Sequence, residues 1–260
     1  MLIPTTWDSY ESWCELDKLA EKARQLRKDS LDLACKNNDG HIAPAFSTVE
    51  ILVALYEQKR DDDRIILSKG HGCLSLYCIL RHKGHNPRYS GHPDIDPENG
   101  LACTTGSLGH GLPIGVGMAF AKKCKNEPGQ VFVVMGDGEC QEGSIWESAN
   151  LARKYRLGNL TVIVDNNNLQ ALSTITEIMD ESNLKGKFKA FGCRTHEIDG
   201  HDFRQILRAI EASRRNQKAT DVIIARTVKG KGLSFMENDP VWHSRLPEGE
   251  TLKQAYRELE

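Results

Sequence analysis

The stretch VFVVMGDG, residues 131–138, joins a run of five apolar residues to an acidic turn. Continuous apolar runs, rather than alternating ones, are typical of strands that are buried on both faces of a parallel sheet. A second run, LTVIV at 160–164, is followed in the same way by DNNN at 165–168. A helical pattern lies between the two runs, which predicts two parallel strands joined by a helix.

The same alternation extends through the rest of the chain. Further strands are expected at 64–68, 194–198 and 222–225, and an amphipathic helix is expected over 16–35. Three S/T-x-x-E/Q patterns predict capping boxes that open helices, at Ser47–Glu50, Ser144–Glu147 and Thr251–Gln254. We therefore expect a single α/β domain over 1–260, with a parallel sheet, helices on both of its faces and a helical N-terminal extension.

Composition excludes several classes of function. Lys plus Arg is 34 and Asp plus Glu is 36, so the formal charge of −2 provides no basic field for nucleic acid or an anionic membrane. The apolar runs are too short to span a membrane, and the N-terminus has no secretory pattern, which favours the cytoplasm. The eight cysteines form no Cys-x-x-Cys pair, so a zinc site of the usual spacing is not expected.

Asp137 and Asn167 each come just after an expected strand. Because ligands bind outside the carboxyl ends of parallel strands, and adjacent strands are ~5 Å apart, both side chains can point at one spot. Carboxylate, amide and carbonyl oxygens are ligands that suit Mg²⁺ or Ca²⁺, and Mg²⁺ is usually completed by phosphate oxygens and water. Either turn alone would be an ordinary tight turn, but the two together predict a metal–diphosphate site.

Histidines are unusually often preceded by glycine. Because glycine is disfavoured inside helices and strands, these histidines are expected in loops or at element ends, where binding groups are common. The pattern predicts a histidine-lined pocket. Six of the nine histidines follow a glycine: His41, His71, His85, His92, His110 and His201.

Gly-Asp-Gly at 136–138, followed by Asn-Asn at 166–167, resembles the thiamine diphosphate motif. The chain as a whole resembles the N-terminal, diphosphate-binding half of a transketolase. The chain departs from the family pattern in two ways. Its stretch between Leu55 and Arg64 is shorter than is usual in the family, and it has Ser107 and His110 where many members carry proline and glutamine. The matching segments, in family order, are NDGHIAPAFSTVEIL, LSKGHG, SGHPD, TTGSLGHGLPIGVGMA, GDGECQEGSIWESA, VDNNNLQ, IDGHD, TVKGKGLSFMEN and WHS.

The resemblance implies a set of metal and diphosphate contacts. Asp137 and Asn167 would ligate Mg²⁺, or Ca²⁺ as a substitute, through their side chains, and Leu169 through its backbone carbonyl. Asn167 thereby also counts among the cofactor contacts. Gly138 would approach the diphosphate, and His71 would contact the same side of the cofactor.

The resemblance also implies contacts with the rest of the cofactor and with the substrate. Gly106 and Leu108 would approach the aminopyrimidine through backbone groups. His243 would contact the diphosphate side, and together with His41 and His92 it would face a sugar or sugar-phosphate substrate and assist proton transfers at its hydroxyls.

A second polypeptide is implied as well. The family places an activating glutamate on the pyrimidine ring from a domain that normally follows this one, and the sequence stops at Glu260, where that domain would begin. Glu142 resembles the acidic residue at the family's subunit interface, near that glutamate. The resemblance therefore implies, as the partner of this chain, a C-terminal, pyrimidine-binding transketolase subunit in an α2β2 heterotetramer.

The implied reaction is ketol transfer in carbohydrate metabolism: a two-carbon unit leaves a ketose, is carried by thiamine diphosphate and adds to an aldose. Two alternatives remain at this point. One keeps the cofactor but decarboxylates a 2-oxo acid and transfers an acyl group, and the other is a non-catalytic binding subunit of the same fold. The histidines at 41, 92 and 243 favour ketol transfer, because polyhydroxy substrates need several proton donors and acceptors.

Overall fold

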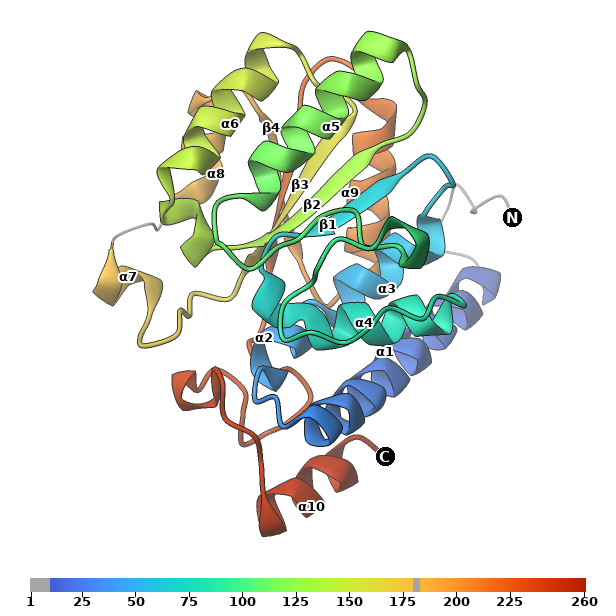
Figure 1. Cartoon of the computed structure of the whole chain (residues 1–260), viewed down its shortest axis with the longest axis vertical. Coiled ribbons are helices and arrows are strands. Elements are labelled where there is room, and N and C mark those ends of the chain that lie inside the picture. The colour runs from blue at the N-terminus through green and yellow to red at the C-terminus, as the bar shows by residue number, and fades with distance from the viewer. Residues whose placement is uncertain (1–9, 180–182) are drawn as a thin grey trace.

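The computed structural model describes residues 10–179 and 183–260. Within these ranges one parallel sheet of five strands forms the centre of the molecule, in the order β1-β2-β3-β5-β4 (Figure 1). This confirms the expected parallel α/β sheet. The strands are β1 (Arg64–Leu67), β2 (Val131–Gly136), β3 (Leu160–Asn166), β4 (Arg194–Asp199) and β5 (Asp221–Arg226).

Helices connect and cover the strands. The helix expected over 16–35 lies within the longer α1, and the short α2, α7 and α8 are additional. The helices are α1 (Tyr10–Asn37), α2 (Ile42–Phe46), α3 (Val49–Gln58), α4 (Cys73–His82), α5 (Gly111–Lys125), α6 (Gly143–Lys154), α7 (Ile175–Ile178), α8 (Leu184–Ala190), α9 (Phe203–Arg215) and α10 (Gly249–Glu258), with short 3₁₀ turns η1 (Gly70–Gly72), η2 (Pro97–Asn99), η3 (Gly138–Gln141) and η4 (Pro240–Trp242).

Successive strand residues serve opposite faces of the sheet. In β2, Phe132 and Val134 belong to a core shared with α1, α3, α4 and α9, whereas Val131 and Val133 belong to a second core with α5, α6 and α8. Figure 1 shows α5 and α6 on the near side of the sheet and α9 behind it. The strands therefore read as unbroken apolar runs, because both of their faces are covered.

The parallel register sets where the polar turns fall. Val131 pairs with Leu160, and the pairing continues to Gly136 opposite Asp165, so β2 and β3 end side by side. Asp137 and Asn167 follow these two ends directly. The two polar turns therefore share one edge of the sheet, as predicted.

The three predicted capping boxes are wrong. Helix α3 begins after Thr48, and Ser47 instead donates a hydrogen bond to the buried carboxylate of Asp165 at 2.6 Å. Helix α6 is N-capped by Glu142, and Ser144 donates to the carbonyl of Gly109 at 2.7 Å. Tertiary partners thus take the hydroxyls that a capping box would use.

The last helix corrects the third prediction, because α10 begins at Gly249, after Glu248, without a side-chain cap. A complete capping box occurs instead at α7, between Thr174 and Glu177.

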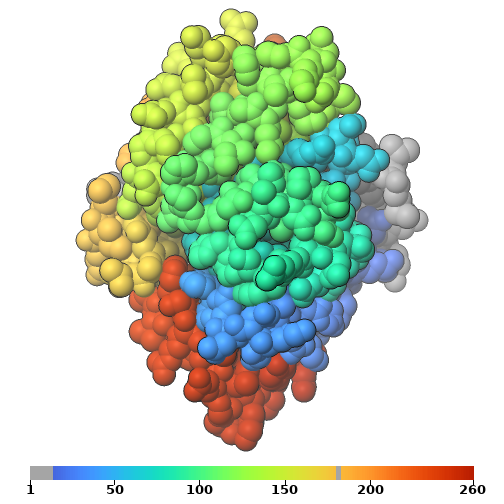
Figure 2. All heavy atoms as spheres, viewed as in Figure 1, coloured from blue at the N-terminus to red at the C-terminus, as the bar shows by residue number. Residues whose placement is uncertain are grey.

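None of the helices in the described ranges has the length and apolar character needed to cross a membrane. The segment between α4 and α5 crosses the front of the molecule, as Figure 2 shows in teal to green.

Candidate active site

The carboxyl ends of β2 and β3 carry the centre of the candidate site. The amide of Asp137 donates to the carbonyl of Asp165 at 3.2 Å, across the gap between the two strands. The carboxylate of Asp137 accepts hydrogen bonds from the amides of Asn168 at 2.6 Å and Gly138 at 2.8 Å. These bonds hold the Asp137 side chain beside the turn that contains Asn167.

Asp137 is a buried carboxyl group in an unfavourable electrostatic position. It is 3% exposed, and burial together with the neighbouring Asp165 raises its pKa to about 6, against the opposing effect of the two amides. A buried carboxylate of this kind is stabilised by a cation. The position therefore suits a metal ligand.

Asn167 and Leu169 supply the remaining oxygen atoms at this edge. The Asn167 side chain donates to Asp165 at 3.2 Å and accepts from the amide of Leu169 at 3.1 Å, which fixes its orientation. Within 10–179 and 183–260 no group of three or more His, Cys, Asp and Glu residues is arranged to hold a metal. A metal here would need amide and carbonyl oxygens beside the Asp137 carboxylate, a donor set that fits Mg²⁺ or Ca²⁺.

Sequence reasoning missed the buried ion pair beneath this edge. Lys69, which follows β1, forms a short ion pair with Asp165, and both side chains are nearly inaccessible to solvent. Burial would raise the pKa of Asp165, but Lys69, Ser47 and Thr227 hold it below its ordinary value. The local signal was a lysine and an aspartate that each follow an apolar run, the same signal that identified Asp137.

A small cavity opens between these groups. Its volume is about 160 Å³, enough for about five water molecules. Lys229 reaches it and donates to the carbonyl of Gln170 at 2.9 Å, and burial and the nearby Lys69 lower its pKa to about 8. Two lysines facing one cavity suit a multiply charged anion. The lining residues include Lys69, His71, Leu108, Asp137, Gly138, Asn167, Leu169, Gln170, Lys229 and His243.

Four histidines form a cluster beside this cavity, and two of them, His71 and His243, line it. The ring centroid of His41 lies 6.3 Å from that of His71, 6.2 Å from His92 and 5.8 Å from His243. Burial and the nearby lysines lower the pKa of His71 well below its usual value and that of His243 to about 3, so both rings are neutral. The predicted histidine-lined pocket exists, although His243 does not follow a glycine.

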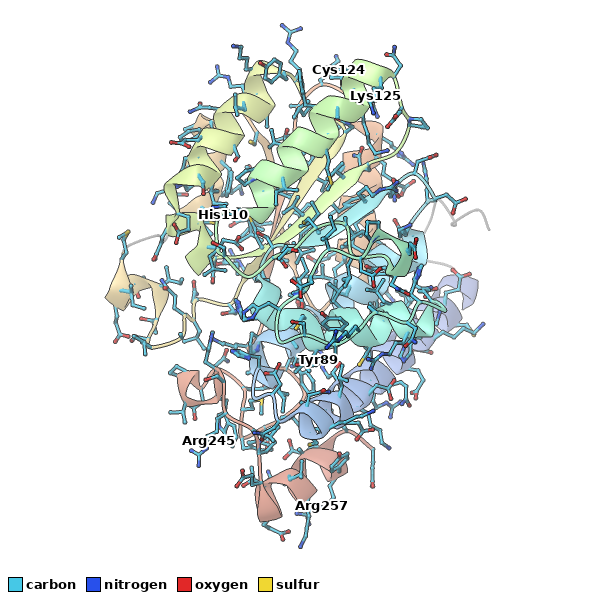
Figure 3. All side chains as sticks on the ribbon, viewed as in Figure 1. Tyr89, His110, Cys124, Lys125, Arg245 and Arg257 are labelled. Carbon is cyan, nitrogen blue, oxygen red and sulfur yellow. The ribbon has the colours of Figure 1, made fainter. Side chains whose placement is uncertain are left out.

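Asp39 and Tyr89 extend the histidine cluster. Nδ1 of His41 lies 2.7 Å from a carboxylate oxygen of Asp39, and the Tyr89 hydroxyl donates to the other oxygen of that carboxylate. Tyr89 comes from the segment between α4 and α5 (Figure 3) and packs against Tyr77 of α4, with ring centroids 5.1 Å apart and planes tilted by 52°. Sequence reasoning did not identify Asp39 or Tyr89.

Close backbone approaches bring the loops of the site together. A Cβ at Gly106, whose φ is +126°, would lie 2.6 Å from the ring of His92, and one at Gly70 would lie 2.7 Å from the amide nitrogen of Gly106. A Cβ at Gly40 would lie 2.0 Å from the carbonyl oxygen of Ser244. The loops that carry His41 and His243 therefore meet backbone to backbone, which only glycine permits.

The other residues predicted for the site differ in whether they line the cavity. Gly138 lies against Gln170, and a Cβ there would be 2.9 Å from that side chain. Leu108 lines the cavity and is 37% exposed. Glu142 is exposed and lies outside the cavity lining. Glu139, which sequence reasoning did not single out, is a second buried acid of this turn, beside Asp137.

Glu139 is held by a dense set of donors. It accepts from the amides of Gly109 at 2.9 Å and Gly136 at 3.2 Å, and from the hydroxyl of Ser68. Burial nevertheless raises its pKa above the ordinary value. Through these contacts Glu139 links the end of β2 to the loop before α5 and holds the Gly-Asp-Gly turn in place.

Other histidines lie apart from the cluster. His201 bonds Glu50 at 2.9 Å and accepts from the amide of Val228 at 2.8 Å, which supports a structural position. His196 lies 2.8 Å from Asp221. The Gly-His pattern thus predicted a pocket but not which histidines form it.

Known proteins resemble the chain over nearly its full length. A family model described as transketolase, thiamine diphosphate binding domain, matches residues 17–257. One of the subunits of the apulose-4-phosphate transketolase of Actinobacillus succinogenes is 36% identical, over 94% of this chain and 96% of that protein. The 6-deoxy-6-sulfo-D-fructose transketolase subunit SqwG of a Clostridium species is 35% identical, over 93% and 96%.

Solved structures share the fold. The transketolase of Campylobacter jejuni superposes with a TM-score of 0.82 at 30% identity, over 93% of this chain and 42% of that one. The Leishmania mexicana transketolase superposes with a TM-score of 0.85 at 22% identity, a likeness of fold alone. The chain thus spans about two fifths of the length of these solved transketolases. The resemblance predicted from sequence motifs is confirmed, and the chain belongs to the transketolase family, in which it matches the thiamine diphosphate binding domain.

Proposed function

We propose that the chain is the diphosphate-binding subunit of a two-chain transketolase, which transfers a two-carbon ketol unit from a ketose to an aldose with thiamine diphosphate and Mg²⁺. One observation carries the proposal. Asp137 and Asn167, at neighbouring strand ends, share a cavity with two buried lysines and with His71 and His243, and the rings of His41 and His92 extend this histidine cluster.

The metal would be held by the side chains of Asp137 and Asn167 and by the carbonyl of Leu169. The high pKa of Asp137 supports this, because a bound cation offsets the cost of ionising a buried carboxyl group. The diphosphate would lie over Gly138, within reach of the ammonium groups of Lys69 and Lys229. Charge neutralisation by lysine and metal together is the usual way to bind such a group.

Gly106, Leu108 and His71 would contact other parts of the cofactor. The first two would approach the aminopyrimidine through backbone groups, and His71 would face the diphosphate side. Thiamine diphosphate, when bound, supplies the carbanion chemistry of the reaction. The protein then needs to orient the substrate and to move protons.

His41, His92 and His243 would act on the substrate. Ketol transfer removes a proton from one sugar hydroxyl as a carbon–carbon bond breaks, and returns a proton when the new bond forms. Imidazole groups that are neutral near pH 7 can serve in both directions. The cluster geometry, with centroids about 6 Å apart, places several such groups around one small space.

A partner chain would complete the site. Relatives of nearly the same length are named as transketolase subunits, and the solved single-chain transketolases are more than twice as long. We infer that a pyrimidine-binding subunit covers the cofactor cavity in a 2:2 assembly. Its activating glutamate would then lie near the exposed Glu142. The substrate would be a ketose with an anionic end group, since the names of the relatives include a sugar phosphate and a sulfo-sugar.

The proposal is tested by reconstitution. The chain is co-purified with the pyrimidine-binding protein from a neighbouring reading frame, and calorimetry measures thiamine diphosphate binding with and without Mg²⁺. Ketol transfer between a ketose phosphate and an aldose phosphate is then assayed beside pyruvate decarboxylation. Tight Mg²⁺-dependent binding with ketol transfer is expected. Turnover of pyruvate alone, or no cofactor binding by the pair, would contradict it.

A further inference from the structure

In two histidines of the cluster, the Nδ1 atoms have partners of opposite charge. Nδ1 of His41 lies 2.7 Å from a carboxylate oxygen of Asp39, and Nδ1 of His243 lies 2.9 Å from the Nζ atom of Lys229. The two rings are close, with centroids 5.8 Å apart and nearly perpendicular planes. One ring therefore faces an obligate acceptor and the other faces a donor, across a single small space.

The Asp39 carboxylate fixes the proton on His41. Burial alone would raise the pKa of Asp39, but hydrogen bonds from His41 and Tyr89 lower it to about 2, so the group is ionised at neutral pH. An ionised carboxylate can only accept hydrogen bonds, so Nδ1 of His41 carries the proton. The backbone amide of His41 also donates to Asp39, at 2.9 Å, which holds the carboxylate in place. In the neutral ring Nε2 is then the bare nitrogen.

Lys229 has the reverse effect on His243. Its ammonium group has donors and no acceptor, and one of them is already used on the carbonyl of Gln170 at 2.9 Å. The contact with Nδ1 of His243 therefore requires a bare Nδ1, so the proton of the neutral ring lies on Nε2. Burial and the charge of Lys229 disfavour the doubly protonated ring.

We propose that Asp39 and Lys229 are positioning residues that impose opposite tautomers on His41 and His243, so that the site presents one proton acceptor and one proton donor to the same substrate. This inference rests on the proposed function. It adds that two residues of the same type have different roles, His41 as the proton acceptor and His243 as the proton donor. Asp39, Tyr89 and Lys229 thereby act through the rings rather than on the substrate.

The division suits the cleavage step. The O–H bond of a substrate hydroxyl breaks as Nε2 of His41 takes the proton, and the oxygen keeps the electron pair that becomes the carbonyl as the carbon–carbon bond breaks. The electrons of that bond pass to the ketol fragment. The resulting imidazolium of His41 is stabilised by Asp39. His243 keeps its proton and donates a hydrogen bond from Nε2 to a second substrate oxygen, and His41 gives its proton back to a substrate oxygen when the new carbon–carbon bond forms.

Tautomers are measured directly by ¹⁵N NMR of the labelled full chain, without cofactor or partner. His41→Gln and His243→Gln assign the signals. A pyrrole-like Nδ1 and a pyridine-like Nε2 are expected for His41, and the reverse for His243. In Asp39→Leu the His41 signals are expected to collapse towards a mixture of both tautomers, and in Lys229→Met the His243 signals are expected to do so. Asp39→Ala, which likewise removes the acceptor, is the second variant if Asp39→Leu does not fold.

Matched controls come from the same chain. Asp29→Asn removes a carboxylate that pairs with His82 at 2.6 Å outside the site, and Lys231→Met removes a lysine two residues from Lys229. Neither is expected to change the signals of His41 or His243. The proposal is overturned if both wild-type rings hold the same tautomer, or if the signals survive in folded Asp39 and Lys229 variants. Because no cofactor is present, this result is independent of whether the assembled pair binds thiamine diphosphate.

Discussion

Asp137 and Asp165 occupy neighbouring strand ends and are joined by a backbone hydrogen bond of 3.2 Å, yet their carboxyl groups have opposite electrostatic environments. Lys69 forms an ion pair with Asp165 and helps hold its pKa down, whereas burial and Asp165 itself raise the pKa of Asp137. The fold thus satisfies one carboxylate internally and leaves the other for a cation from outside.

Replacement of Asp137 by Ala is expected to abolish Mg²⁺-dependent binding of thiamine diphosphate while the fold is retained, because the variant loses the anionic ligand of the metal. Calorimetry on the assembled pair measures the loss, and circular dichroism checks the fold. The half-buried Asp202, which caps α9, gives an aspartate control as Asp202→Asn. Unchanged binding in Asp137→Ala would exclude this residue as a ligand.

The metal-free chain is expected to lose stability as the pH rises from 4 to 7, in the part of its pH dependence that is due to Asp137. The folded pKa of about 6 is above the unfolded value, so the folded state holds the proton more tightly and its advantage is lost as the pH rises through 6. The effect is roughly 3 kcal/mol at most. Urea midpoints of wild type and Asp137→Asn at both pH values measure it, and parallel curves for the two proteins would refute it.

Lys69→Met is expected to destabilise the fold by about 3–5 kcal/mol, because it leaves the fully buried Asp165 without its cation. Lys69→Met combined with Asp165→Asn is expected to recover part of this loss. Urea denaturation provides the measurement. Lys231→Met is the control, since Lys231 is half-exposed and its ion pair with Glu237, at 3.4 Å, contributes little to stability. Equal losses in the single and double variants would contradict the coupling.

His41→Ala and His243→Ala are each expected to lower turnover by ~10²–10⁴-fold with a nearly unchanged melting temperature, because both rings lie in loops and would transfer protons in the proposed reaction. Steady-state kinetics of the pair and thermal denaturation of the chain separate the two effects. His82→Ala, on the exposed end of α4, is expected to retain full turnover. Variants that unfold would mean that the cluster is structural.

The chain alone is expected to be inactive in ketol transfer, with Mg²⁺, thiamine diphosphate, ketose phosphate and aldose phosphate all supplied. The acid that activates the pyrimidine ring comes, in this proposal, from the partner. Activity is expected to appear on titration with the partner and to saturate at equal amounts of the two chains. Full activity without the partner would rule out the two-chain enzyme.

Strand positions and the sheet edge shared by the two polar turns were predictable, because a parallel sheet covered on both faces needs unbroken apolar runs and the carboxyl ends of its strands lie at one edge. The runs before Asp137 and Asp165 therefore located the site without any structure. Helix starts were not predictable from local pattern. Ser47 matches a cap signal but bonds Asp165, which lies 118 residues away in the chain.

The site residues that sequence reasoning missed were missed for one reason. Lys69, Asp39 and Glu139 work through partners from other segments, and nothing in their own neighbourhoods marks them as paired. Histidine illustrates the difference: the glycine before His41 marked a loop, but only the fold shows that His71, His92 and His243 arrive at the same place. Sequence pattern identifies element ends, and tertiary contact decides which ends meet.

The backbone contact between Gly40 and Ser244 also constrains when the site can exist during protein synthesis. At ~5–20 residues per second, on the order of 10–40 s pass between the addition of His41 and that of His243 to the growing chain. During this time Asp39 and Tyr89 can already hold His41, while the face that will receive His243 stays open. The four-histidine cluster can therefore form only after synthesis has passed His243 and Ser244.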